Sequence, residues 1–100
     1  MNWYWTWGGE CFGYRVKDRL FAHHGIEVGH FDEDEVYGSD GRYLGEVKSE
    51  KRLITHRAKK NWRRCGFTPT RYGSYARYCN YVGYMMYAGY EDFPSPEDFR

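Results

Sequence analysis

Apolar residues and glycines recur at a fixed interval in the first half of the chain. Three segments align on a leading glycine, and these glycines stand 16 residues apart: Gly9-Glu-Cys-Phe-Gly, Gly25-Ile-Glu-Val-Gly and Gly41-Arg-Tyr-Leu-Gly. Each segment runs through a charged patch into an apolar pair: Leu20-Phe21, Val36-Tyr37 and, after one extra residue, Leu53-Ile54. Such a period indicates a repeated supersecondary unit.

Each unit has the pattern of two short strands joined by a solvated turn, because the charged patch separates two apolar segments. The large apolar residue of each unit (Phe12, Val28, Leu44) is predicted to lie in the core. The glycine that follows it (Gly13, Gly29, Gly45) interrupts a strand, which favours a bulge or a close approach of another backbone.

The two ends of the chain have the pattern of a fourth unit that is split in two. Residues 3–8 carry the apolar pair, and residues 79–90 repeat the apolar–glycine pattern with Val82 as core residue and Gly83 as structural glycine. Residues 81–90 fit either a strand or a short helix, and a strand is favoured for the first half. We therefore expect an all-β fold of four short hairpins with approximate four-fold pseudo-symmetry, closed by pairing of the N- and C-terminal half-units. Closure would protect strand edges from aggregation.

The recurring glycine units, together with the segment Gly41-Arg-Tyr-Leu-Gly-Glu and the tail from Tyr81 to Pro94, resemble the four-fold beta flower proteins. The resemblance covers roughly residues 3–56 and 79–94. It implies a pseudo-symmetric all-β fold, and it carries no assigned activity or catalytic residues. Residues 57–78 depart from the family pattern.

Composition agrees with one small domain spanning residues 1–100, with units at about 9–24, 25–40 and 41–56, a basic excursion at 57–78 and an irregular acidic tail at 91–100. Aromatic residues make up 21% of the chain, which suits short strands better than long amphipathic helices. The three cysteines are an odd count without a CxxC pair, so we expect free thiols. The start lacks a signal-peptide pattern and no apolar run is long enough for a membrane span, which predicts a cytoplasmic protein.

The segment 57–78 holds 7 of the 15 basic residues and no acidic one, and aromatic residues are interleaved with its charges. Such a mixture can neutralise phosphates and stack bases. The candidate binding residues are Lys59, Lys60, Trp62, Arg63, Arg64 and Arg71. Two other interpretations stay open: a loop that lies against the chain's own acidic turn (Asp32 to Glu35) or tail (Glu91-Asp92), and a protein interface.

No spacing of histidines and cysteines indicates a metal site, no glycine-rich loop indicates a phosphate or cofactor site, and no catalytic residue can be assigned. The leading hypothesis is a non-enzymatic binding or structural module, acting on a protein partner or through self-association. Nucleic-acid binding through 57–78 is the alternative, and an enzyme with a site assembled across the units is the third hypothesis. None of the three involves a membrane or a cofactor.

Overall fold

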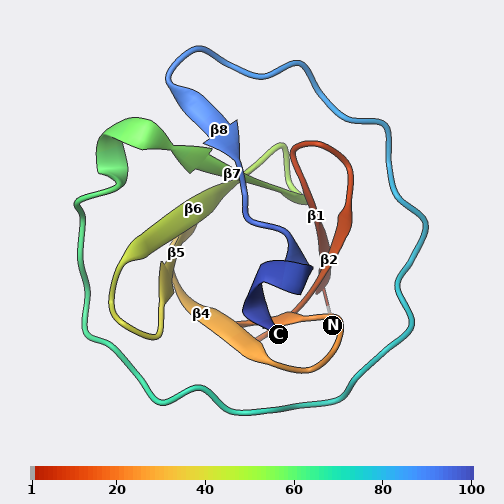
Figure 1. Ribbon diagram of the computed structural model, residues 1–100, viewed down its shortest axis with the longest axis vertical. Helices are drawn as coiled ribbons and strands as arrows, with labels where there is room; N and C mark the ends of the chain where they lie inside the picture. Colours follow the sequence, from red (N-terminus) through yellow and green to blue (C-terminus); the bar gives the residue numbers. More distant parts are fainter. Residues whose placement is uncertain (1) are drawn as a thin grey trace.

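The computed structural model describes residues 2–100 and contains eight strands with no α-helix among them. Seven strands form a closed barrel, and β8 adds to β7 at its outside (Figure 1). The strands are β1 (Asn2–Thr6), β2 (Cys11–Val16), β3 (Arg19–Ala22), β4 (Glu27–Asp32), β5 (Glu35–Gly38), β6 (Tyr43–Lys48), β7 (Arg52–His56) and β8 (Tyr90–Asp92). Two 3₁₀ helices complete the elements, η1 (Arg57–Lys59) and η2 (Pro96–Phe99).

The barrel closes between β1 and β7, which differs from the predicted pairing of the two chain ends. Neighbouring strands along the chain are antiparallel, so the first and seventh strands point the same way and must pair in parallel. Among residues 2–100, two residue pairs form this closure, Trp5 with Arg52 and Thr6 with Leu53. The predicted pairing of the chain ends is not formed, because β1 and β8 lie one after the other along the edge of β7 that is opposite β6. β1 pairs with Arg52 and Leu53, and β8 pairs with the next residues, Ile54 to His56.

Each of the three core residues predicted for the units lies at a β-bulge. The pairing of β1 with β2 skips Phe12, that of β3 with β4 skips Val28, and that of β5 with β6 skips Leu44. A bulge bends its strand and increases the local twist, which helps a small barrel to close. Phe12 and Val28 are buried in the core, and Leu44 packs against them half-buried.

The glycine after each bulge leaves no room for a side chain. At Gly29, a Cβ atom would lie 2.7 Å from the Tyr37 carbonyl oxygen and 2.7 Å from Val36 Cγ1. At Gly45 it would lie 2.6 Å from the Ile54 carbonyl oxygen. Gly13 likewise faces the backbone of Phe21 and Ala22. These glycines therefore allow adjacent strands to pack closely at the bulges.

Residues 60–89, called the strap below, run around the outside of the barrel without a regular strand or helix (Figure 1). The strap makes the same pair of backbone hydrogen bonds at each of three barrel turns. Its N–H groups bond to the turn glycines Gly41, Gly25 and Gly9 from Arg64, Tyr72 and Tyr81, each at 2.8 Å. Three residues later, the N–H groups of Phe67, Tyr75 and Tyr84 bond to Ser39, His23 and Trp7 at 2.8–3.0 Å.

The strap overturns the prediction that Val82 is a core residue. Residues 81–84 contain no strand, and Val82 is 86% exposed. The strap is bonded to the barrel here by the backbone of Tyr81 and Tyr84 and by the Val82 carbonyl oxygen, so the Val82 side chain is not drawn into the core. Gly83 nevertheless lies at a close approach, since a Cβ there would be 2.7 Å from the Gly8 carbonyl oxygen.

The C-terminal residues close one end of the barrel (Figure 1). Phe93 is 3% exposed and meets Phe12 edge-to-face, with 5.2 Å between the ring centroids. Pro96 is fully buried and its carbonyl oxygen lies 2.8 Å from His24 Nε2. The expected irregular tail thus ends in η2, whose first turn is held by a Ser95–Asp98 capping box.

Candidate functional site

The outer face of β1 and the residue that follows it present a tryptophan ridge made of Trp3, Trp5 and Trp7. Alternate residues of a strand face the same side, so spacing by two places all three indoles under the strap. The strap meets them with tyrosines at every third position from 72 to 90. Trp5 stacks on Tyr81 at 4.0 Å and 13° between the ring planes, and Trp7 meets Tyr84 at 4.9 Å and 65°.

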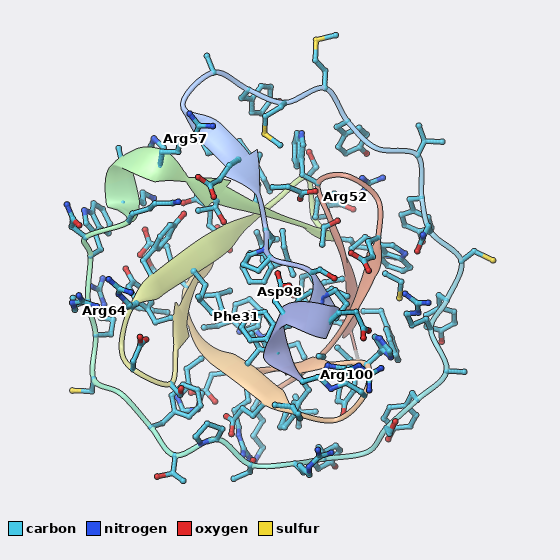
Figure 2. All side chains as sticks on the ribbon, in the orientation of Figure 1. Phe31, Arg52, Arg57, Arg64, Asp98 and Arg100 are labelled. Carbon is cyan, nitrogen blue, oxygen red and sulfur yellow. The ribbon has the colours of Figure 1, made fainter. Side chains whose placement is uncertain are left out.

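Polar contacts hold the strap on this ridge. The indole N–H groups of Trp5 and Trp7 donate to the carbonyl oxygens of Cys79 and Met85 at 2.9 and 3.0 Å. Arg52 lies between β7 and the strap (Figure 2) and donates to the Val82 carbonyl oxygen at 2.8 Å. Burial of a tryptophan or arginine costs little when its donors are satisfied in this way.

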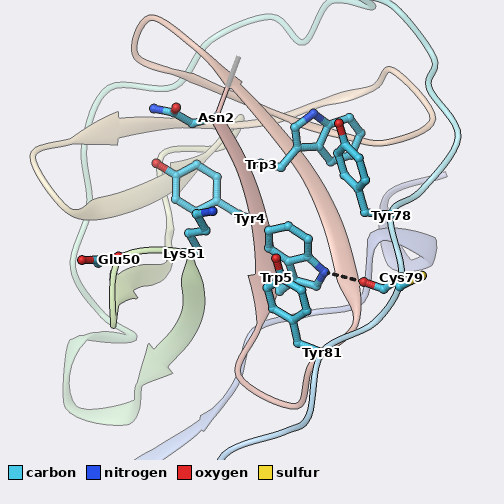
Figure 3. A pocket seen from close by; sticks show the side chains of 9 residues that line it. All are labelled: Asn2, Trp3, Tyr4, Trp5, Glu50, Lys51, Tyr78, Cys79 and Tyr81. Atoms are coloured by element: carbon cyan, nitrogen blue, oxygen red, sulfur yellow. Dashed lines mark hydrogen bonds between the residues drawn. The ribbon is translucent and has the colours of Figure 1, made fainter.

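A pocket of about 610 Å³ opens beside the ridge at the seam where the barrel closes. The seam pocket is lined by Asn2, Trp3, Tyr4, Trp5, Glu50, Lys51, Tyr78, Cys79 and Tyr81 (Figure 3). It forms because β1 and β7 pair only at Trp5 and Thr6, which leaves the first half of β1 unpaired on that side. The strap supplies the third wall. Its volume falls in the range of small-molecule sites.

The side chains of Asn2, Glu50 and Lys51 give the seam pocket a polar rim. Within residues 2–100, the side chains of Asn2, Glu50 and Lys51 make no hydrogen bond and no ion pair. The Lys51 ammonium lies 6.0 Å from the Trp5 ring centroid, the outer limit of a cation–π contact. The pocket therefore combines aromatic walls with one ammonium, one carboxylate and one amide that have no hydrogen-bond or ion-pair partner in the described part of the chain.

The basic residues predicted from the sequence do not line this pocket, and most are neutralised by the chain's own carboxylates. Lys59 Nζ lies 2.8 Å from Glu35 and 2.9 Å from Glu46, and these bonds raise the pKa of Lys59 against the opposing effect of burial. Arg64 lies 2.7 Å from Asp32, and Lys60 lies 2.8 Å from the carboxylate of Glu91. The expected contacts with the acidic turn and tail are thus present.

Trp62, Arg63 and Arg71 are the remaining members of the predicted set. Trp62 is 44% exposed and lies beneath the Lys59 ammonium, 5.1 Å from the ring centroid. Arg63 and Arg71 pair through their backbones with Arg42 and Ile26, and their side chains make no ion pair within residues 2–100. The structure distributes the six predicted residues from the end of η1 along the strap, with the Trp62 ring beside the Lys59 charge.

A buried carboxylate fastens the middle of the strap. Glu27 on β4 accepts bonds from Arg19 at 3.0 Å, His30 at 2.7 Å, and both the N–H and hydroxyl of Thr70 on the strap. Burial alone would raise the pKa of Glu27, but the bonds from Arg19, Thr70 and His30 outweigh it and lower the pKa to about 2. Glu27 is therefore ionised and serves the fold.

The nucleophilic and metal-binding residue types do not converge among residues 2–100. Cys11 is fully buried, which raises its pKa, whereas Cys65 and Cys79 are exposed on the strap. His23 Nε2 lies 3.6 Å from Glu97, and no group of three His, Cys, Asp or Glu residues in the described chain could hold a metal ion. No helix among these residues is both long and apolar enough to cross a membrane.

Sequence reasoning missed the seam pocket, although two signals for its walls were present. Tryptophan at positions 3, 5 and 7 follows the strand period of two, and tyrosine from 72 to 90 follows a period of three. A period of three is that of an extended polyproline-like chain with one face turned to a surface. Neither signal shows that the two segments meet, because more than 60 residues separate them.

Comparison with known proteins yields no relative. No family model matches the chain, and no curated protein or solved structure is significantly similar to it. The geometry of the seam pocket is therefore the basis on which a function can be argued.

Proposed function

We propose that the protein is a non-enzymatic binding module whose ligand occupies the seam pocket. The observation that carries this proposal is the set of unused polar groups around an aromatic wall: Asn2, Glu50 and Lys51 have no partner within residues 2–100. A mostly aromatic pocket with a few convergent polar groups is the usual form of a ligand site.

The test uses the indole N–H signals of the four tryptophans in a ¹⁵N–¹H NMR spectrum. The protein is titrated with a fragment library that contains neutral, anionic and cationic ring compounds. Fragments that enter the seam pocket should shift the Trp3 and Trp5 signals while the Trp62 signal stays fixed, since Trp62 lies on the strap beside Lys59. If no fragment moves Trp3 or Trp5, the proposed site is wrong.

Nucleic-acid binding remains the second proposal for residues 57–78. It is supported by the exposed Trp62 with Arg63 and Arg71, whose side chains have no ion pair in the described chain. It is weakened by the ion pairs of Lys59, Lys60 and Arg64. In the same NMR titration, a single-stranded oligonucleotide that shifts only the Trp62 signal, and does so less at higher salt, would favour this function.

The four-fold arrangement and the resemblance to the four-fold beta flower proteins also stay proposals. Supporting them, Gly9, Gly25 and Gly41 share a left-handed φ of 100°, 99° and 85°, and Gly89 before β8 has a φ of 81°. On this basis we assign the front half of the fourth unit to residues 89–93. Association through a protein partner or a second copy would use the exposed strap side chains Val82 and Met85.

A further inference from the structure

The charges of the seam pocket oppose a strongly charged ligand. Glu50 and Lys51 are adjacent in the β6–β7 turn, and both side chains are free of partners within residues 2–100. An anion drawn to Lys51 would be repelled by Glu50. A quaternary ammonium that sought the Trp5 ring would meet the Lys51 ammonium, 6.0 Å from the ring centroid. The ligand that fits these charges has no net charge of its own.

The rim of the pocket equally opposes a purely apolar ligand. Such a ligand would cover Asn2, Glu50 and Lys51 without giving them hydrogen bonds, and an unbonded buried polar group costs free energy. The carboxylate offers only acceptors, the ammonium only donors and the amide both. A ligand that satisfies all three groups must itself carry several donors and acceptors, and hydroxyl groups supply both.

The aromatic walls are held in place before any ligand binds. Trp3 meets Tyr78 edge-to-face at 4.9 Å and 85°, and Trp5 is stacked on Tyr81 (Figure 3). The bond from the Trp5 indole to Cys79 adds to this rigidity. Rigid tryptophan and tyrosine side chains provide a large contact surface at a low cost in conformational entropy. Their faces suit a flat apolar surface on the ligand.

We infer that the seam pocket binds an uncharged saccharide, an inference that rests on the binding function proposed above. A sugar ring joins the two required features, because one face carries C–H groups that pack on an aromatic ring and its edge carries hydroxyl groups. The C–H face lies against Trp3 and the exposed ring of Tyr78, because Trp5 is 4% exposed and stacked on Tyr81. The hydroxyl edge bonds to Asn2, Glu50 and Lys51.

The experiment measures binding of the full chain to an array of neutral oligosaccharides, followed by titration of the best binder. Four variants are compared with the original chain: Trp3→Ala, Glu50→Gln, Lys51→Met and, as matched control, Trp62→Ala. We expect Trp3→Ala to weaken binding about tenfold, the worth of one aromatic stacking contact. Glu50→Gln and Lys51→Met, both on an exposed turn, should each weaken it about fivefold or more without unfolding the protein. Trp62→Ala should leave it unchanged.

The outcomes distinguish a wrong class of ligand from a wrong binding site. Binding to no saccharide of the array, while fragments still shift the Trp3 and Trp5 signals, overturns the inference and leaves the binding module standing. The inference is likewise overturned if decaproline, trimethyllysine or a single-stranded oligonucleotide binds the seam pocket and the saccharides do not. Saccharide binding that Trp62→Ala abolishes, and that Glu50→Gln and Lys51→Met spare, places the sugar elsewhere and overturns it as well.

Discussion

At the residue scale, Glu27 is the side chain that couples the barrel to the strap. Its carboxylate is 1% exposed and receives bonds from β3, β4 and the strap at once. A buried charge of this kind is tolerable only because Arg19 and His30 lie against it. Loss of the charge would leave one good acceptor oxygen in place of two for these donors and would loosen Thr70.

The free energy of unfolding should therefore fall in acid, because Glu27 becomes protonated. Its pKa is lowered from 4.5 to about 2 on folding, so the unfolded chain takes up the proton first, and the stabilisation is lost as the pH falls from about 5 toward 2. Glu27→Gln should lower the free energy of unfolding at pH 7 by about 2 kcal/mol and flatten this pH dependence.

Urea unfolding of the original protein and of the Glu27→Gln variant at pH 7, 4 and 3 measures the change in the free energy of unfolding. Glu33→Gln is the matched control, because Glu33 is an exposed turn residue with no ion pair in residues 2–100. A Glu27→Gln protein whose stability still falls as steeply with acid as the original would contradict the assignment.

At the scale of elements, the strap is held by repeated backbone bonds and aromatic contacts, since it has no ladder of its own. It encircles a barrel whose turns present their carbonyl groups outward at Gly9, Gly25 and Gly41. Within residues 2–100, the N–H groups of the strap between the two bonds at each turn have no backbone acceptor. This alternation gives the strap a distinctive pattern of solvent protection.

Amide hydrogen exchange should reproduce that pattern. We expect the N–H groups of Arg64, Phe67, Tyr72, Tyr75, Tyr81 and Tyr84 to exchange slowly, because each bonds to a barrel carbonyl. The N–H groups of Val82 and Met85, which have no backbone acceptor in the described chain, should exchange at near random-coil rates. Uniformly fast exchange along residues 60–89 would mean that the strap is not docked in solution.

At the scale of the whole molecule, β1 is the strand that links the two ends of the barrel sheet and also contacts the strap. It pairs with β2, closes the barrel on β7 and carries the tryptophan ridge beneath the strap. Barrel closure removes the free edges that open sheets expose. The C-terminal residues then close one barrel end with Phe93 and Pro96.

Deletion of residues 1–7 should unfold the domain, because it opens the barrel and removes the surface on which the strap lies. Circular dichroism should show no cooperative melting transition for the truncated chain. Val82→Asp serves as a contrast: at 86% exposure it should leave the melting temperature almost unchanged, whereas a core position would lose several degrees. A truncated chain that melts as cooperatively as the full one would refute the role of β1.

Much of the barrel could be predicted from local pattern. Phe12, Val28 and Gly29 were identified because the core residue and the close-packed glycine of each unit are adjacent in the sequence. The expected one-residue insertion in the third turn is also present, where Ser49 and Glu50 both take a positive φ while the first two turns have one such residue each. Val82 was misassigned because, on the strap, the apolar–glycine pattern does not mark a core residue: Gly83 lies against the Gly8 carbonyl oxygen while Val82 is exposed.

The candidate site could not be predicted to the same extent. The seam pocket combines residues from the first strand, the β6–β7 turn and the strap, and no short-range signal links these three segments. The six basic residues were visible as a charge cluster, yet their state depends on whether carboxylates such as Glu35 and Glu46 lie within reach.

The β class, the spacing of turns and bulges and the core of the first three units follow from local sequence, because side-chain alternation, charged turns and glycines act over a few residues. The closure of the barrel, the path of the strap and the pairing of its charges depend on segments that are far apart in the chain and meet when it folds. Seven alternating strands bring β1 beside β7 in parallel, and that closure joins Trp3 and Trp5 to Glu50 and Lys51 across almost 50 residues of chain. The seam pocket exists because a short parallel seam leaves half of β1 free.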